Sequence, residues 1–232
     1  MFINGFDILW DEIDDYVADI KSIRSIEQFT FTKPVTFFCG ENGSGKSTLL
    51  EALAIKNGLN PEGGTRNYNF STYDSYSNLH KHMRLWRSRK LDWMYFLRAE
   101  SFYNVATKEM EYSGVFSERY HDQSHGQSFF SVLMKQTNKN GLYLLDEPEA
   151  ALSCQNQLAL LYLNEECVKQ NCQFIIATHS PILLGFPNAQ ILSFDEDKVE
   201  EVDYKSTSSY QTMKLFLDRY DYFVEDIKEN EI

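Results

Sequence analysis

The sequence has few cysteines, few basic residues and no long apolar run. Its four cysteines are Cys39, Cys154, Cys167 and Cys172. No two of them form a Cys-x-x-Cys pair and no histidines stand at zinc-ligand spacing, which argues against a zinc site and favours reduced thiols in the cytoplasm. A membrane-spanning helix would need about 18 or more apolar residues in a row, and no secretory leader is recognisable. We therefore expect a soluble, cytoplasmic protein that reaches a membrane only through a partner.

Basic residues are scarce because 22 lysines and arginines stand against 34 aspartates and glutamates, which gives a formal net charge of −12. This acidity disfavours a broad nucleic-acid-binding surface. The exception is a basic stretch at residues 80–90 with one tryptophan among its charges: Lys81, Arg84, Trp86, Arg87, Arg89 and Lys90. The stretch could contact a nucleic-acid backbone or an acidic partner. A solvated helix face that balances the acidic N-terminus is the favoured interpretation.

Apolar and aromatic residues are abundant, at 43% and 15% of the chain, which argues for a packed core and against general disorder. Short runs of strand length stand between helix-like segments at Ile26–Phe31, Val35–Cys39, Trp93–Leu97, Leu142–Leu145 and Gln173–Ala177. The order predicts a single α/β domain over residues 1–232, with a mostly parallel core sheet, flanking helices and a small helical insert at roughly 57–140. Residues 2–26 have a spacing closer to helical than to alternating, and residues 210–232 follow an amphipathic helical pattern.

A glycine-rich loop is the strongest motif in the chain. Residues 40–48 read Gly-Glu-Asn-Gly-Ser-Gly-Lys-Ser-Thr, which fills the pattern G-x-x-x-x-G-K-[ST] between a predicted strand and a predicted helix. That context predicts a P-loop, whose backbone N–H groups and helix N-terminus bind phosphate oxygens. We expect Lys46 to reach the β- and γ-phosphates and Ser47 to hold Mg²⁺. The candidate nucleotide-binding residues are Glu41, Asn42, Gly43, Ser44, Gly45, Lys46, Ser47 and Thr48.

Acidic residues follow the predicted strand Leu142–Leu145, which runs directly into Asp146-Glu147-Pro148-Glu149. An acid at the carboxyl end of a strand beside a P-loop can hold Mg²⁺, so Asp146 is a candidate metal residue. The next residue, Glu147, is placed to orient or deprotonate an attacking water. An acidic first turn of a helix after a strand would give the same sequence, but the presence of the P-loop favours the catalytic interpretation.

Two other predicted strands also end in polar residues. Gln173–Ala177 leads to Thr178-His179-Ser180, where His179 could hydrogen-bond a γ-phosphate. Trp93–Leu97 leads to Arg98-Ala99-Glu100, at the sheet edge where active-site loops of α/β proteins gather. Glu100 could ligate Mg²⁺ or position water, and Arg98 could pair with a phosphate. A purely structural Arg98–Glu100 pair is equally favoured.

The order of these motifs, together with Ser124-His125-Gly126-Gln127, resembles that of ABC-type ATPases. It is most similar to the small stand-alone ATPases of the AAA family that are related to SMC-like and DNA-repair ABC heads. The resemblance implies that Ser124, Gly126 and Gln127 of one subunit complete the nucleotide site of the other. It also implies a Walker B role for Asp146, a catalytic role for Glu147 and a switch role for His179. Ser153 stands where the family's D-loop usually has an aspartate.

The resemblance implies Mg·ATP binding and hydrolysis by an ATP-dependent homodimer that drives a conformational change in a protein partner. A slow-turnover, ATP-gated switch is the alternative. It is suggested because the signature segment of the family, here Ser124-His125-Gly126-Gln127, is altered, and because Ser153 replaces the D-loop aspartate. A DNA-repair-like ATPase would rest on the basic stretch alone. The ATP-binding subunit of a transporter is disfavoured because no Q-loop glutamine follows the strand Trp93–Leu97.

Overall fold

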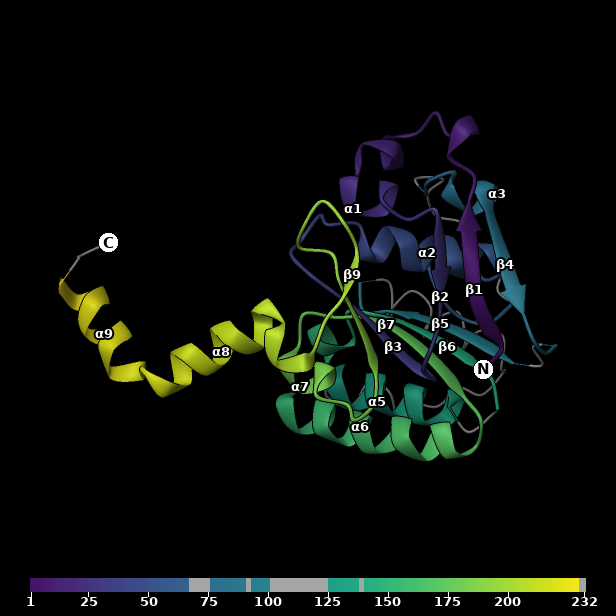
Figure 1. Ribbon diagram of the computed structural model, residues 1–232. Helices are drawn as coiled ribbons and strands as arrows, with labels where there is room; N and C mark the ends of the chain where they lie inside the picture. The colour runs from purple at the N-terminus through teal and green to yellow at the C-terminus, as the bar shows by residue number, and fades with distance from the viewer. Residues whose placement is uncertain (67–75, 91–92, 101–124, 138–139, 230–232) are drawn as a thin grey trace.

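A computed structural model of the protein describes residues 1–66, 76–90, 93–100, 125–137 and 140–229. Within these ranges the largest sheet has six strands in the order β5-β6-β7-β3-β8-β9 (Figure 1). The strands are β3 (Val35–Cys39), β5 (Met94–Arg98), β6 (Leu142–Asp146), β7 (Gln173–Ala177), β8 (Gln190–Ser193) and β9 (Glu200–Glu201). Only the β8–β9 pair in this sheet is antiparallel. The predicted α/β fold with a mostly parallel sheet is therefore confirmed.

The parallel strands form because their residues can be buried on both faces of the sheet. All five residues of β3, β6 and β7 are buried, as expected for continuous apolar runs in a covered parallel sheet. Neighbouring residues face opposite sides, so Phe38 and Leu144 belong to one core cluster while Phe37 and Tyr143 belong to the other. The second cluster lies under α5 (His125–Gln136) and α6 (Cys154–Lys169).

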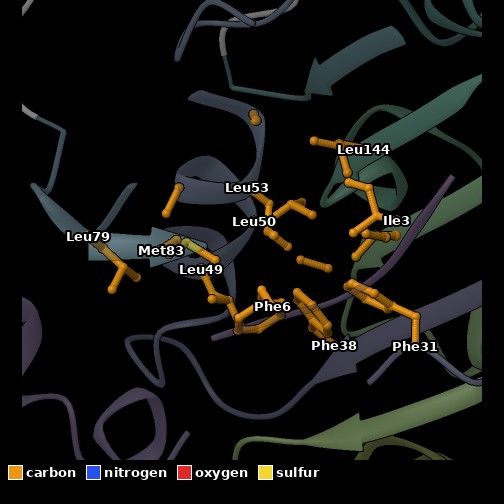
Figure 2. Packing of buried hydrophobic residues seen from close by; sticks show 14 of the residues in the cluster. Ile3, Phe6, Phe31, Phe38, Leu49, Leu50, Leu53, Leu79, Met83 and Leu144 are labelled. Atoms are coloured by element: carbon orange, nitrogen blue, oxygen red, sulfur yellow. The ribbon is translucent and has the colours of Figure 1, made fainter. Parts of the chain in front are cut away.

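The first cluster joins the six-stranded sheet to α2 (Lys46–Lys56) and to a second, three-stranded sheet. This antiparallel sheet has the order β2-β1-β4, with β1 at Ile3–Ile8, β2 at Gln28–Thr30 and β4 at Met83–Arg87. Figure 2 shows Phe6 of β1 among Phe38 of β3 and Leu49 and Leu50 of α2. The P-loop helix is thus packed between the two sheets.

The expectation of helical structure across residues 2–26 is wrong at its beginning. Residues Ile3–Ile8 form the central strand β1, followed by the short helices η1 (Trp10–Glu12), η2 (Tyr16–Asp19) and α1 (Lys21–Arg24). The strand is stabilised by β4, which lies about 80 residues away along the chain, so local spacing could not reveal it. Gly5 permits the close pairing, because a Cβ there would collide with the Phe29 carbonyl oxygen and the Trp86 ring.

The basic stretch is also not a helix face. It forms α3 (Leu79–His82) and then the edge strand β4. Part of its charge stabilises the fold: Arg87 donates to Asn57 Oδ1 at 3.0 Å, and the Arg89 guanidinium lies 5.2 Å from the centre of the Phe2 ring. The predicted insert at 57–140 therefore contains β4 and β5 as well as helices. Because residues 67–75 and 101–124 lie outside the described residues, the division into core and helical insert stays a prediction.

The C-terminal part of the chain is helical, as predicted. It forms two helices, α8 (Ser208–Asp218) and α9 (Tyr220–Glu229). Three short helices precede them along the chain: η4 (Pro148–Ala151), α7 (Pro181–Leu184) and η5 (Tyr204–Ser206). The helix breaks at Arg219, and the two pieces extend away from the body (Figure 1). Within the described ranges no helix combines the length and the apolar character needed to cross a membrane.

Candidate functional site

The polar residues singled out from the sequence meet at one edge of the six-stranded sheet. The strands β5, β6, β7 and β3 are parallel neighbours, so their carboxyl ends point the same way. The glycine-rich loop follows β3, Arg98 ends β5, Asp146 ends β6 and His179 follows β7. Open α/β sheets bind ligands at this edge. The structure therefore brings the predicted strand-end residues together.

The glycine-rich loop has a backbone that only glycines adopt readily. Gly40, Gly43 and Gly45 have φ angles of 137°, 80° and 98°, which L-residues rarely reach. Gly45 is the N-cap of α2, which begins at Lys46. The loop therefore curls ahead of a helix N-terminus, whose free N–H groups and dipole favour an anion.

Lys46 is buried at the mouth of this loop, with 3% of its surface exposed. Its ammonium donates to the carbonyl oxygens of Gly40 (2.8 Å) and Glu41 (2.7 Å) and to Ser44 Oγ (3.4 Å). Burial lowers the pKa of Lys46, and the carboxylates of Glu147, Asp195 and Asp146 oppose that shift. The amine is therefore held where a phosphate bound to the loop would meet it.

Ser47 and Asp146 are in direct contact. The Ser47 hydroxyl donates to Asp146 Oδ1 at 2.8 Å. Burial raises the pKa of Asp146, while Arg98 and the Ser47 hydrogen bond lower it. Among the described residues no three His, Cys, Asp or Glu side chains form a metal cluster. The oxygen pair still suits Mg²⁺, which takes few protein ligands and fills its sphere with phosphate oxygens and waters.

Glu147 has an unusual backbone conformation next to this pair. Its φ of 47° and ψ of 51° are left-handed, which is uncommon outside glycine and marks stored strain. Its Oε1 lies 3.6 Å from Nε2 of His179, and the His179 backbone N–H donates to Glu149 Oε1 at 2.6 Å. The Nε2 atom is buried and has no hydrogen-bond partner in the described part of the chain. Glu147 and His179 thus lie side by side.

Arg98 contacts a carboxylate that sequence reasoning missed. Its Nη1 lies 2.6 Å from Glu51 Oε2 and its Nε lies 3.3 Å from Asp146 Oδ2. Burial raises the pKa of Glu51, and Arg98 opposes that shift. A sequence signal did exist, because Glu51 follows Ser47 by four residues and so lies on the same face of α2. The guanidinium therefore bridges the P-loop helix and the Walker B-like strand.

Glu100 is a less central residue than the sequence suggested. Its carboxylate lies 3.8 Å from Arg98 Nη2, and 88% of its side chain is exposed. The main partner of Arg98 is therefore Glu51, and the Arg98–Glu100 pair is the longest of its three carboxylate contacts. A role for Glu100 in metal binding stays a prediction.

Asp195, after β8, is a second residue that the sequence did not reveal. Its Oδ1 accepts the backbone N–H of Glu41 at 2.8 Å, so it fixes the first turn of the glycine-rich loop. Its Oδ2 accepts hydroxyl hydrogen bonds from Ser193 at 3.1 Å and from Ser208 at 3.0 Å. One carboxylate thus connects the loop to the start of α8.

The signature-like residues can be placed only in part. Ser124 lies outside the described residues, whereas Gly126 and Gln127 lie in the first turn of α5. Their contribution to a second subunit's site stays a prediction. Ser153 has a structural role: its hydroxyl accepts a hydrogen bond from the Asn156 N–H at 3.3 Å and so caps the N-terminus of α6.

The family match agrees with this geometry. A family model described as "AAA domain" matches residues 17–231, which include all of the site residues named above. The chain belongs to the AAA domain family. No curated protein matches this AAA domain.

Solved structures share its fold at low sequence identity. An ATP-binding cassette of an ABC transporter is 15% identical and aligns with a TM-score of 0.50 over 87% of this chain and 91% of that one. The SMC head domain from Thermotoga maritima is 14% identical, with a TM-score of 0.47 over 87% and 98% of the two chains. The AAA domain therefore has a P-loop ATPase fold of the ABC type. Its family supports nucleotide binding and hydrolysis.

Proposed function

We propose that this AAA domain binds Mg·ATP at residues 40–48 and hydrolyses it with Glu147 as the catalytic base. The observation that carries the proposal is the 2.8 Å contact between Ser47 Oγ and Asp146 Oδ1, with Glu147 next in sequence. This contact joins the phosphate-binding loop to the acidic strand end. The two motifs therefore act on one ligand rather than on separate ones.

The binding step follows from the loop. Its backbone N–H groups and the α2 N-terminus would surround the phosphates, and Lys46 would supply a positive charge beside them. Ser47 and Asp146 would hold Mg²⁺, which when bound neutralises charge on the β- and γ-phosphates. The buried Nε2 of His179, which has no hydrogen-bond partner among the described residues, would suit a hydrogen bond to a phosphate oxygen. These groups stabilise charge without having to reorganise during the reaction.

The chemical step needs a base beside the attacking water. Glu147 Oε would accept the water proton as the water oxygen bonds to the γ-phosphorus and the bond to the bridging oxygen breaks. The left-handed backbone of Glu147 directs this carboxylate toward His179 rather than along the strand. The products are ADP and inorganic phosphate. The strained backbone of Glu147 supports its assignment as the catalytic base, because such strain is common at active sites.

We further propose that two copies of the chain meet over the bound ATP. In that arrangement Ser124, Gly126 and Gln127 of one copy would face the γ-phosphate held by the other. The start of α5 among these residues supports this, because a helix N-terminus favours an anion. Opening and closing of the pair would drive a conformational change in a protein partner. Comparing the turnover rate with the rate of dimer opening separates such a machine from a slow ATP-gated switch.

The test is Glu147→Gln, with Glu165→Gln on the outer surface of α6 as the matched control. We expect Glu147→Gln to lower steady-state phosphate release by about 100-fold or more, the usual contribution of a general base. Its ATP affinity should be retained, and the ATP-bound dimer should accumulate. The control should release phosphate at the wild-type rate. Wild-type turnover by Glu147→Gln would refute the assignment of the base.

A further inference from the structure

The segment Ser208–Glu229, which we call the arm, leaves large apolar side chains exposed. No residue of α8 is buried, and the exposed fractions of Phe216, Tyr220 and Ile227 are 41%, 55% and 60%. The arm extends from the body as two consecutive helices (Figure 1). Exposed apolar surface of this kind on a folded protein marks an interaction site.

Five apolar residues of the arm form one continuous stripe, while the exposed Leu215 and Tyr222 lie on the other side of the helix. Its members recur at intervals of three or four residues and so share one side of the helix; they are Met213, Phe216, Tyr220, Phe223 and Ile227. The Phe216 ring lies 5.8 Å from the rings of both Tyr220 and Phe223, centre to centre. These contacts cross the break at Arg219. The stripe is therefore a single surface on both α8 and α9.

The charges of the arm favour a protein as its partner. Five acidic side chains stand against three basic ones between residues 208 and 229. Helices that lie on membranes carry a basic polar face that is attracted to anionic lipids, and nucleic acid requires the same sign of charge. An acidic arm with an aromatic stripe is suited to neither of these.

The root of the arm lies at the nucleotide edge of the sheet. Ser208 Oγ donates to Asp195 Oδ2 at 3.0 Å, and the other oxygen of that carboxylate accepts the Glu41 N–H of the glycine-rich loop at 2.8 Å. The preceding turn is fixed by the Tyr204 hydroxyl, which donates to the Pro181 carbonyl oxygen at 2.9 Å. The arm thus starts from the edge at which two copies would meet over ATP.

We propose that the arm docks its aromatic stripe on a second copy of this chain. The choice of a second copy rests on the proposed function, because the nucleotide edge is the face that the two copies would share. In a two-fold pair each arm reaches the other copy, so the contact is made twice. A pair held by the nucleotide alone would leave both stripes in water. The arm therefore supplies an apolar contact beside the phosphate-mediated one.

The test compares Tyr220→Asp with Tyr222→Asp in the full chain. Both tyrosines are exposed, at 55% and 61%, so neither change should unfold the protein. They make the same substitution about 200° apart around the helix axis. The Tyr222 ring contacts Phe223 of the stripe edge-on, at 5.7 Å between ring centres, but projects from the opposite side of the helix. Self-association of wild type and both variants is measured by sedimentation velocity, with and without Mg·ATP. ATP affinity and phosphate release are measured on the same samples.

We expect Tyr220→Asp to weaken self-association by about 30-fold or more, the loss typical of a central aromatic residue in an interface. Tyr222→Asp should associate like wild type, and both variants should bind ATP normally. Equal association of the two variants would overturn the proposal, and so would a wild type that is monomeric at every concentration. Binding to phosphatidylcholine–phosphatidylglycerol vesicles that depends on Tyr220, without self-association, would overturn it in favour of a membrane.

The two proposals fail in different ways. If wild type binds no ATP but forms a dimer that Tyr220→Asp disrupts, the docking arm stands and the nucleotide function falls. If ATP binding, turnover and dimerisation all occur and Tyr220→Asp changes none of them, the nucleotide function stands and the arm proposal falls. Each result is decisive because association and ATP binding are read out separately.

Discussion

The three-stranded sheet and the carboxyl-end edge of the six-stranded sheet bury different kinds of side chain. The three-stranded sheet contributes Ile3, Phe6 and Ile8 to the apolar cluster that it shares with α2. The edge of the six-stranded sheet buries Lys46, Glu51 and Asp146, and burial shifts the pKa of each toward its uncharged form. Apolar burial stabilises a fold, whereas burial of ionised groups opposes it unless they are paired. The three-stranded sheet therefore contributes stability, whereas the six-stranded sheet combines an apolar core with an edge whose buried ionisable groups oppose folding.

The largest expected effect comes from the stabilising sheet. Phe6 is fully buried, so Phe6→Ala should lower the free energy of unfolding by about 3–5 kcal/mol. ATP affinity of the folded molecules should not change, since Phe6 belongs to the apolar cluster beneath α2 rather than to the polar site. Urea unfolding and calorimetric ATP titration below the transition measure the two quantities. Leu9→Ala, at a site that is 54% exposed, is the control.

Weaker ATP binding by Phe6→Ala, at a temperature where the variant is folded, would contradict the separation of the two regions. The Phe6 ring packs against α2, the helix whose N-terminus is proposed to bind the phosphates (Figure 2). A coupled loss would mean that the three-stranded sheet sets the position of the P-loop. The two sheets would then be one functional unit rather than a support and a site.

The second prediction removes the charge at the loop. Lys46→Ala should lower ATP affinity by about 100-fold or more, the usual loss when one partner of a buried charge pair is removed. The free energy of unfolding should change little or rise, because a buried ammonium disappears. Lys56→Ala, at the other end of α2, should bind ATP like wild type. Unchanged affinity of Lys46→Ala in a calorimetric titration would exclude the residue from phosphate binding.

Lys46→Ala probes one of the features that were easiest to predict, whereas Phe6 lies in a strand that the sequence pattern did not reveal. Strands β3, β6 and β7 are predicted by short apolar runs in the local sequence, and the glycine-rich loop is predicted by its own sequence motif. The direction of those strands then brings Lys46, Asp146 and His179 to one edge without further information. The sequence was therefore sufficient for the ABC-type fold and for the proximity of the main candidate residues.

The features that were missed depend on long-range pairing. β1 is a strand because Met83–Arg87 lies beside it, and the spacing within residues 2–26 does not show this. Arg98 meets Asp146 because β5 and β6 are neighbours in register, and strand order is not written in either strand. Asp195 reaches the loop because β8 lies beside β3. In each case sheet order, rather than a local motif, selects the partner.

The third prediction concerns the pairing of Arg98. Arg98→Lys should lower turnover by about tenfold, the equivalent of one charge-assisted hydrogen bond. A lysine has a single ammonium and cannot contact Glu51 and Asp146 with the two separate nitrogens that the guanidinium uses. Single-turnover kinetics and ATP affinity distinguish lost positioning from lost binding. The exposed Arg84→Lys is the control, and equal rates for the two variants would reduce Arg98 to a structural residue.

The smallest expected effect would show directly that the site opposes stability. Burial raises the pKa of Asp146 above its ordinary value of 3.8. Ionisation of this carboxyl therefore costs folding free energy at every pH above the raised pKa, and the cost disappears as the pH falls to 3.8. Asp146→Asn keeps the shape and can still accept the Ser47 hydrogen bond. The variant should therefore have a higher Tm than wild type at neutral pH, although it should lose turnover.

Thermal unfolding from pH 7 toward pH 4 measures this difference, with the exposed Asp203→Asn as the control. The gain in Tm should shrink on acidification, because wild type then takes up the proton that relieves the buried charge. It should also be smaller than the loss caused by Phe6→Ala. A lower Tm of Asp146→Asn at neutral pH would show that the contacts with Ser47 and Arg98 outweigh the cost of burial. The edge around Asp146 would then stabilise the fold, as the three-stranded sheet does.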